Sequence, residues 1–323
     1  MYNRIITHQD FDGVVSAVLC SHAFQTNQIV FTQPRVVQDA RISITDDDIV
    51  CDLPYPLECG MWFDHHEGNL EDLQFRKIDP ATLEGRFQVR DSCARVIYEY
   101  LQDQQMPDFF AEMVKEADII DAFNYKNIED WRAETPGKMI DAAIKVTDNS
   151  QDQKRQFLRS LVQLLKERPI DQVALTPGVT KRYKLFQQVE EEMLELIGEN
   201  ISFLPQDEDK KLIIIDLTRH AKRTFIYKNL ACLIEPDAQA VIQVSSLYQN
   251  QVKTNDLSFS MSLSVNMNQA EHHKDIGEIM RLLNIGNGHP GAAAGSVYCD
   301  SKAEMLKQKE QVLNEIYRLF TEQ

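Results

Sequence analysis

Three apolar runs near the N-terminus each end in side chains that bind metals, and this recurrence constrains the fold more than any other feature. The runs are RIIT (4–7), IVC (49–51) and MWF (61–63). Turn-forming residues separate them, and GVVSAVLCSHAF (13–24) follows the first run with helical periodicity. A further apolar run, QIVFTQ (28–33), comes after this helical stretch. Short apolar runs that alternate with a helical stretch predict a mainly parallel α/β sheet in this part of the chain.

The metal-type side chains follow these runs closely: His8, Asp10, Asp12, Asp52, Asp64, His65 and His66. In an extended segment, positions i, i+2 and i+4 point to one side, so His8, Asp10 and Asp12 can converge. Open α/β sheets bind ligands beyond the carboxyl ends of their strands, so the three ends can form one site. A single such aspartate is more often a turn former or a helix cap, but three strand ends together predict a metal centre.

The chemistry of these ligands points to hard divalent cations. Carboxylate and imidazole ligands without thiolate favour Mn²⁺, with Mg²⁺, Co²⁺ and Fe²⁺ as alternatives. Two such ions, about 3.5 to 4 Å apart, acidify a water between them to a bridging hydroxide and neutralise charge as a phosphoryl group is attacked. One carboxylate must then be shared by both ions. Asp52 is the candidate, because its strand is expected at the centre of the sheet.

The rest of the chain predicts a second domain. A length of 323 residues exceeds what one hydrophobic core usually reaches. Helical periodicity continues from Asp91 to about residue 200, and the polar stretch PQDEDKK (205–211) follows. Beyond it, LIIIDL, AVIQVSSLY and LSFSMSLSV alternate as strands do. We therefore predict a first domain over 1–200, which includes a connecting helix, and a smaller α/β domain over 205–323.

Charge and composition limit the partners. The formal net charge of −16 opposes binding of long duplex DNA, because such binders usually present a broad basic face. A polyanionic substrate should therefore be short. No run approaches the roughly 20 apolar residues that span a bilayer, and MYNRIITHQD does not resemble an export signal, so a cytoplasmic protein without membrane partners is expected. The six cysteines form no C-x-x-C pair and are expected to be reduced.

The motifs also resemble a known family. His8-x-Asp10-x-Asp12-Gly13, Asp52 and Asp64-His65-His66 resemble the first three motifs of the DHH phosphoesterases. The segment GNGHPGAAAGS (286–296) is similar to the glycine-rich part of the C-terminal domain associated with that family. The resemblance implies a catalytic domain over 1–200 and a substrate-binding domain over 205–323, and it leaves a homodimer open.

The resemblance also implies roles for individual residues. His8, Asp10 and Asp52 would hold one metal ion, and Asp12, Asp52 and His65 would hold the other together with an aspartate of a fourth motif. His66 would face the substrate and stabilise the phosphoryl group or the leaving oxygen. Substrate contacts in the second domain are expected from four residues: Gly286, Gly288, His289 and Gly291.

The fourth motif lies within EADIIDAF (116–123), where Asp118 and Asp121 are three residues apart on one helical face. We favour Asp121 as the ligand, and expect Asp118 to be solvated or to accept hydrogen bonds. Asp64 is expected to orient an imidazole rather than to bind a metal, because histidine ligands commonly have such a partner.

The sequence departs from the family pattern near its C-terminus. The usual triple glycine is Gly286-Asn287-Gly288, and Gly291-Ala-Ala-Ala-Gly295 contains one additional alanine. Ser262-Leu-Ser264 stands where nucleotide-cleaving relatives often have Ser-x-Arg. Loss of that arginine would remove a bidentate phosphate contact.

Three functions are therefore considered. The first is a manganese-dependent phosphoesterase acting on short nucleotides, either short oligonucleotides or phosphoadenosine phosphate. The second is hydrolysis of inorganic polyphosphate or pyrophosphate, which is less favoured because related manganese pyrophosphatases have three residues between the histidine and the first aspartate, not one. The third is a non-catalytic, nucleotide-binding regulatory protein, against which the complete set of predicted ligands argues.

Overall fold

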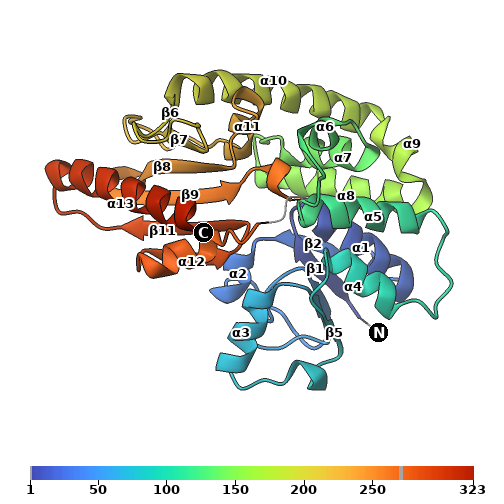
Figure 1. Ribbon diagram of the computed structural model, residues 1–323. Helices are drawn as coiled ribbons and strands as arrows, with labels where there is room; N and C mark the ends of the chain where they lie inside the picture. The colour runs from blue at the N-terminus through green and yellow to red at the C-terminus, as the bar shows by residue number, and fades with distance from the viewer. Residues whose placement is uncertain (1, 269–271) are drawn as a thin grey trace. The chain divides into compact units, whose positions relative to one another are not determined.

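The computed structural model describes residues 2–268 and 272–323 and divides into two compact units (Figure 1). The first unit comprises residues 1–124 and 134–187, and the second comprises residues 125–133 and 188–323. The division falls within the long helix α10 (Pro177–Asn200), whereas the sequence pattern placed the boundary at residues 200–205. Whether either part folds as an independent domain stays a prediction.

The first unit contains a five-stranded sheet in the order β2-β1-β3-β4-β5. All its pairings are parallel, which confirms the predicted mainly parallel sheet, and β3 occupies the central position expected for the strand before Asp52. The bounds are β1 (Arg4–His8), β2 (Ile29–Thr32), β3 (Asp48–Cys51), β4 (Met61–Asp64) and β5 (Gly85–Phe87).

The central strands are apolar on both sides because both faces of the sheet are covered. Ile5 and Phe63 join the large core cluster, which includes helix α1, whereas Ile6, Val50 and Trp62 belong to a smaller cluster on the opposite face. This burial fixes the strands in register, so their carboxyl ends are held level with one another.

The helices of the first unit surround this sheet. Residues 11–21 of α1 are buried on all sides, as expected for a central helix. The helices are α1 (Phe11–Phe24), α2 (Pro34–Gln38), α3 (Glu67–Phe75), α4 (Cys93–Tyr100), α5 (Phe110–Asp121), α7 (Pro136–Lys145), α8 (Gln151–Glu167) and α9 (Ile170–Ala174), with a short 3-10 turn, η1 (Pro80–Thr82). Among the described residues, no helix is both long enough and apolar enough to cross a bilayer.

The second unit contains a six-stranded mixed sheet in the order β10-β11-β9-β8-β7-β6. Its strands are β6 (Ile201–Ser202), β7 (Leu212–Asp216), β8 (Ala240–Gln249), β9 (Val252–Leu263), β10 (Gly286–His289) and β11 (Ala292–Val297). The three strands predicted after the polar stretch are β7, β8 and β9. β7 and β8 are parallel, and the other pairs are antiparallel.

Helical segments complete the second unit: α6 (Ile128–Arg132), η2 (Lys228–Leu230), α11 (Ala231–Ile234), η3 (Val265–Met267), α12 (Ile276–Leu282) and α13 (Lys302–Glu322). The buried residues of α12 and α13 pack with one face of the sheet, including Leu257 and Phe259 of β9. Ile213 and Ile215 of β7 face a separate cluster on the other side. The predicted α/β architecture with a second, smaller sheet domain is therefore confirmed at the level of fold.

The glycine-rich segment forms a hairpin of β10 and β11. Gly286 pairs with Gly295, and Gly288 pairs with Ala293. A Cβ atom on Gly286 would lie 2.0 Å from the Ala294 carbonyl oxygen, and one on Gly288 would lie 2.4 Å from the Ala293 Cβ. These glycines are needed for close backbone approach. Glycine and alanine have low strand propensity, so the sequence pattern did not predict the hairpin.

Candidate metal centre

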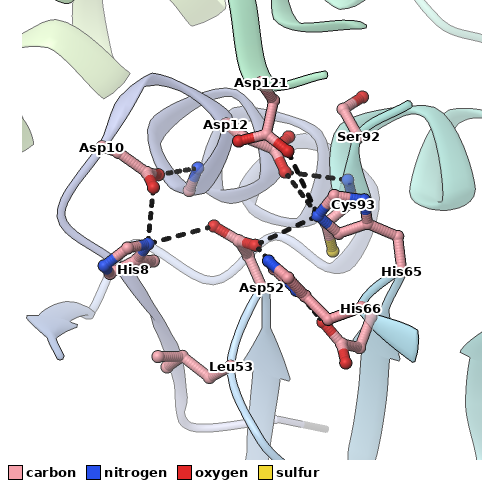
Figure 2. Close-up of polar contacts among 12 residues, drawn as sticks. His8, Asp10, Asp12, Asp52, Leu53, His65, His66, Ser92, Cys93 and Asp121 are labelled. Atoms are coloured by element: carbon pink, nitrogen blue, oxygen red, sulfur yellow. Dashed lines mark hydrogen bonds and ion pairs between the residues drawn. The ribbon is translucent and has the colours of Figure 1, made fainter. Parts of the chain in front are cut away.

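The carboxyl ends of β1, β3 and β4 bring the predicted ligands together (Figure 2). Thr7 of β1 is in register with Cys51 of β3, which is in register with Phe63 of β4. The residues that follow these positions therefore leave the sheet at the same edge, which is where α/β proteins bind ligands. Figure 2 shows the carboxylate of Asp52 between His8 on one side and the two histidines after β4 on the other.

His8, Asp10 and Asp52 form the first group of potential ligands, with their ligand atoms within 4.8 Å of one another. The His8 Nδ1 atom lies 2.5 Å from Asp10 Oδ2 and 3.6 Å from Asp52 Oδ2. Asp10 also caps α1, since its side chain accepts a hydrogen bond from the Gly13 backbone N–H at 2.9 Å. A Cβ atom on Gly13 would lie 2.4 Å from the His8 carbonyl oxygen, so glycine permits this close turn from β1 into the helix.

Asp12, His65 and Asp121 form the second group, with the same mutual limit of 4.8 Å. The His65 Nε2 atom lies 3.3 Å from Asp121 Oδ2 and 3.8 Å from Asp12 Oδ2. Its Nδ1 atom lies 3.0 Å from the Arg90 carbonyl oxygen, which can accept its proton. This hydrogen bond fixes the ring so that Nε2 faces the two carboxylates.

Asp12 is held by the first turn of α4. Its two carboxylate oxygens accept hydrogen bonds from the backbone N–H groups of Cys93 and Ala94, both at 2.8 Å. The first N–H groups of a helix have no partner within the helix, so they bind and orient an anion well. The sequence predicts a helix near Asp91, but nothing in it shows that this helix points at Asp12, 81 residues away from Cys93.

Asp52 lies between the two groups. Its Oδ1 atom is 3.7 Å from His65 Nε2, and its Oδ2 atom is 3.6 Å from His8 Nδ1. The residue adopts a left-handed backbone conformation with φ of 56°, which aspartate tolerates better than most residues and which occurs often at functional sites. The two oxygens of Asp52 therefore face different sets of ligands.

Several buried polar atoms at this site have no hydrogen-bond partner within the described part of the chain: Asp52 Oδ1, Asp52 Oδ2 and His65 Nε2. Buried polar groups are almost always paired, because leaving one unpaired costs about 1 to 3 kcal/mol. A pair of divalent cations would provide a partner for each of these atoms. The donor set of carboxylates and imidazoles therefore fits a two-cation centre of the kind that hard metal ions occupy.

The crowding of buried carboxyl groups raises the pKa values of three of them. Burial, followed by repulsion from Asp52 and Asp121, raises the pKa of Asp12 well above its usual range. Burial and the charge of Asp52 raise the pKa of Asp121 to about 7. The pKa of Asp52 is raised by burial and by Asp10. It is therefore unfavourable for these carboxyl groups to be ionised together, and added positive charge would reduce their mutual repulsion.

The pKa values of two histidines are also raised, which favours their charged form. Burial lowers the pKa of His8, but its contacts with Asp10 and Asp52 outweigh burial and raise the pKa to about 11. Burial likewise lowers the pKa of His65, and Asp52 followed by Asp12 raises it to about 10. Protons therefore supply positive charge to the protein without cations, and metal binding must displace them.

Asp64 and His66 form a hydrogen-bonded pair next to these two groups, and His66 also belongs to a third group of potential ligands, with Asp52 and His65. The fully buried carboxylate of Asp64 lies 2.9 Å from His66 Nδ1 and accepts a hydrogen bond from Asn69 Nδ2 at 2.7 Å. Asp64 belongs to none of the potential metal groups found in the described residues. The His66 side chain is 50% exposed, so Asp64 can orient a ring that remains accessible to a ligand.

Asp118 has a different role from Asp121, one helical turn away. Its carboxylate accepts hydrogen bonds from Arg95 at 3.0 and 2.5 Å and from Ser92 Oγ at 2.7 Å. These contacts join α5 to the start of α4, so both oxygens of Asp118 are engaged. The structure brings Asp121, and not Asp118, to the second group.

The predicted substrate residues of the second unit lie on the β10–β11 hairpin. Gly288 and His289 are exposed, and Gly291 occupies the turn, where its carbonyl oxygen accepts a hydrogen bond from Leu263 N. Ser262, which stands in the place of the family's Ser-x-Arg serine, donates a hydrogen bond to Asn229 Oδ1 at 2.6 Å. Contact of Gly286, Gly288, His289 and Gly291 with substrate stays a prediction.

Comparison with solved structures identifies the fold. The chain is similar to PggH, a pGpG-specific phosphodiesterase from Vibrio cholerae, with 21% identity over 97% of this chain and 98% of that chain and a TM-score of 0.71. Exonuclease RecJ bound to manganese has 11% identity, coverage of 98% and 90%, and a TM-score of 0.52. The DHH domain of a member of the s1p family of ribosomal proteins has 13% identity, coverage of 98% and 86%, and a TM-score of 0.53.

These likenesses confirm the resemblance to the DHH phosphoesterases at the level of fold. The chain has a fold shared by phosphodiesterase, exonuclease and DHH-domain structures along nearly its whole length. No protein-family model matches the sequence, and no curated protein matches it in a sequence search.

Proposed function

We propose that this protein is a phosphoesterase that hydrolyses the phosphodiester bonds of short nucleotides with the help of two divalent cations, manganese being preferred. The position of Asp52 carries the proposal. Its two buried oxygens have no partner in the described chain and face different groups of ligands, His8 and Asp10 on one side and His65 on the other. A carboxylate in this arrangement suits a bridge between two cations.

The ligands divide between the two cations. His8 and Asp10 would hold one, and Asp12, His65 and Asp121 would hold the other, with Asp52 shared by both. When bound, the cation pair supplies a water of lowered pKa as nucleophile and neutralises negative charge on the phosphoryl group. The α4 N-terminus keeps Asp12 in position through two backbone hydrogen bonds, and the Arg90 carbonyl keeps His65 in its ring orientation.

His66 and Asp64 would act on the substrate rather than on a cation. Asp64 accepts the Nδ1 proton of His66, which leaves Nε2 of the half-exposed ring for an oxygen of the phosphoryl group. A protonated imidazole at this place stabilises the charge that develops in the transition state or protonates the leaving oxygen. The buried aspartate favours that protonated form, since burial lowers the pKa of His66 but Asp64 raises it above its usual value.

Short nucleotides are the substrates best supported. The net charge of −16 opposes long polyanions, and among the similar structures PggH is described as specific for the dinucleotide pGpG. A 5′-phosphorylated diribonucleotide is therefore the first substrate to test. RNA of two to five nucleotides and phosphoadenosine phosphate come next. RecJ, which shares the fold and was solved with manganese, supports Mn²⁺ as the first metal.

The test is a Mn²⁺-supplemented panel of pGpG, short RNA, short DNA, phosphoadenosine phosphate and inorganic polyphosphate. We expect turnover of at least one short nucleotide by the wild type and none by Asp52→Asn. Asp48→Asn is the matched control, because it removes a buried carboxylate from the other end of the same strand and should retain activity.

The alternatives have distinct outcomes in this panel. Phosphate release from polyphosphate without nucleotide cleavage would replace our proposal with the polyphosphatase function. Nucleotide binding without any turnover would instead establish the non-catalytic regulatory protein. Equal activity of Asp52→Asn and the wild type would reject the proposed centre itself.

A further inference from the structure

A cavity of about 310 Å³ opens in the first unit beside the metal centre. Its walls come from the residues after β1 and β2, including Gln9, Asp10 and Gln33, and from the segment 141–154, which joins α7 to α8. Asp10 belongs both to this wall and to the first group of metal ligands. A molecule in the cavity would therefore lie next to the proposed reaction centre.

The charges that line the cavity are almost all paired within the protein. Asp141 lies 2.5 Å from Lys145 Nζ, and Asp148 accepts two hydrogen bonds from Arg182, at 2.6 and 2.8 Å. Lys154, in the first turn of α8, also lines the cavity. Within the described residues, the Lys154 ammonium group has no hydrogen bond or ion pair.

Lys154 is partly buried, which makes an unpaired ammonium group unfavourable. Burial, followed by repulsion from Arg182, lowers the pKa of Lys154 to about 8, although Asp148 and Asp141 partly oppose this effect. The side chain is still mainly charged at pH 7. An anion entering the cavity would offset both causes, because it replaces lost solvation and forms a direct ion pair with the ammonium group.

The other walls suit the neutral parts of a nucleotide. The Gln9 amide donates to the Phe31 carbonyl at 3.3 Å, and the Gln33 amide donates to Gln9 Oε1 at 3.4 Å. Both hydrogen bonds are long, so these amides can turn to a ligand at low cost. Ile144 and Val146 add apolar surface. The volume is near the lower limit of about 300 Å³ for ligand sites. A few polar groups on an apolar wall of this size can bind one nucleotide unit but not an oligonucleotide.

We propose that this cavity binds the nucleotide unit next to the scissile phosphodiester, with Lys154 contacting a phosphate of that unit and the amides of Gln9 and Gln33 contacting its base or ribose. This inference rests on the proposed function and adds a reason for preference for short nucleotides. A simple phosphodiester that lacks a nucleotide unit could be cleaved at the metal centre without using the cavity.

The experiment compares Lys154→Gln and Lys154→Arg with Lys181→Gln, a control at an exposed lysine of α10 in the same unit. Each variant is assayed with Mn²⁺ on pGpG and on bis(p-nitrophenyl) phosphate, which has no nucleotide unit. We expect Lys154→Gln to raise KM for pGpG about tenfold, the loss typical of a charge-assisted hydrogen bond, with little change in kcat. Lys154→Arg should recover most of this loss, and the simple diester should be hydrolysed equally by all variants.

Binding of GMP, measured by titration calorimetry, is a readout that does not depend on turnover. GMP represents one nucleotide unit with its phosphate, and Lys154→Gln should weaken its binding about tenfold without changing the manganese content. Equal GMP affinity and equal KM for pGpG in Lys154→Gln and Lys181→Gln would overturn the inference. Failure of the wild type to hydrolyse either diester would instead reject the proposed function, and the GMP titration would still decide whether the cavity binds a nucleotide.

Discussion

Asp48 and Asp52 lie at opposite ends of the same central strand and are equally buried, with exposed fractions of 1% and 2%. Asp48 accepts hydrogen bonds from Arg4 at 2.6 and 2.8 Å and from the Thr45 backbone N–H at 2.8 Å. Asp52 has no hydrogen-bond partner for either oxygen in the described structure. Two residues of the same type, four positions apart, therefore have opposite surroundings.

The difference appears in their protonation. Burial alone would raise the pKa of Asp48, but the Arg4 and Thr45 contacts outweigh it and lower the pKa below its usual value. The pKa of Asp52 is raised by burial and by Asp10. The negative charge of Asp48 thus stabilises the fold, whereas that of Asp52 destabilises the protein without cations. A buried charge that the fold does not stabilise indicates a group kept for binding or catalysis.

The largest effect should come from Asp52→Asn. Loss of the carboxylate that we propose is shared should reduce turnover by about a thousandfold or more, because both cations would lose a ligand. The metal-free variant should melt no lower than the wild type, since the substitution removes an unfavourable charge. Calorimetric Mn²⁺ titration and thermal melting in EDTA measure the two effects. Loss of activity together with a large drop in the melting temperature would mean that Asp52 is structural, as Asp48 is.

A second comparison uses the two aspartates of α5. Asp121→Asn should weaken Mn²⁺ binding about a hundredfold, because it would remove a proposed ligand from the second group. Asp118→Asn should leave Mn²⁺ affinity nearly unchanged and lower the stability by about 1 kcal/mol, because it weakens the Arg95 and Ser92 contacts at a partly exposed position. Metal titration of both variants is the measurement. A reversed order would assign the ligand role to Asp118.

Asp48→Asn should show the opposite pattern to Asp52→Asn. It should lower the free energy of unfolding by about 1 to 2 kcal/mol, a value reduced because the Arg4 side chain is 29% exposed. Activity per folded molecule should remain within about twofold of the wild type, because Asp48 belongs to none of the potential metal groups found in the described residues. Urea unfolding in EDTA gives the stability. An unchanged midpoint would show that the Arg4 pair contributes nothing.

The smallest effect is the pH dependence of the same pair. Because the pKa of Asp48 is lower in the folded protein, its contribution to stability is complete above the unfolded value of about 3.9. It is lost as pH falls through the lower, folded value. The stability difference between wild type and Asp48→Asn should therefore be constant from pH 5 to 7 and shrink below about pH 4. Urea midpoints measured across this range test the sign, and a difference that grew in acid would contradict it.

Local sequence patterns sufficed for much of the fold. The strand predictions at β1, β2, β3, β4, β7, β8 and β9 followed apolar runs between turn residues, because such runs must be buried wherever they lie. β5 and β6 are too short to give a pattern, and the glycine and alanine residues of β10 and β11 resemble a loop. These four segments form strands because they pair with neighbouring strands, and a local sequence pattern carries no information about that pairing.

The site divides in the same way. His8, Asp10, Asp12, Asp52 and His65 could be grouped from sequence because parallel strands end at one edge of a sheet. The backbone atoms that position these residues could not be predicted from sequence. They are the Cys93 and Ala94 amides that bind Asp12, and the Arg90 carbonyl that orients His65. The cavity with Lys154 also escaped prediction, because segments more than a hundred residues apart form its walls. These features depend on contacts between segments that are distant in the sequence, and not on the spacing of residues within one segment.

The most direct test of the account is anomalous diffraction at the manganese edge from crystals grown with Mn²⁺. We predict two peaks about 4 Å apart, one beside each oxygen of Asp52, with His8 and Asp10 around one peak and Asp12, His65 and Asp121 around the other. A single ion, or ions bound at a place that Asp52 does not contact, would contradict the two-cation centre.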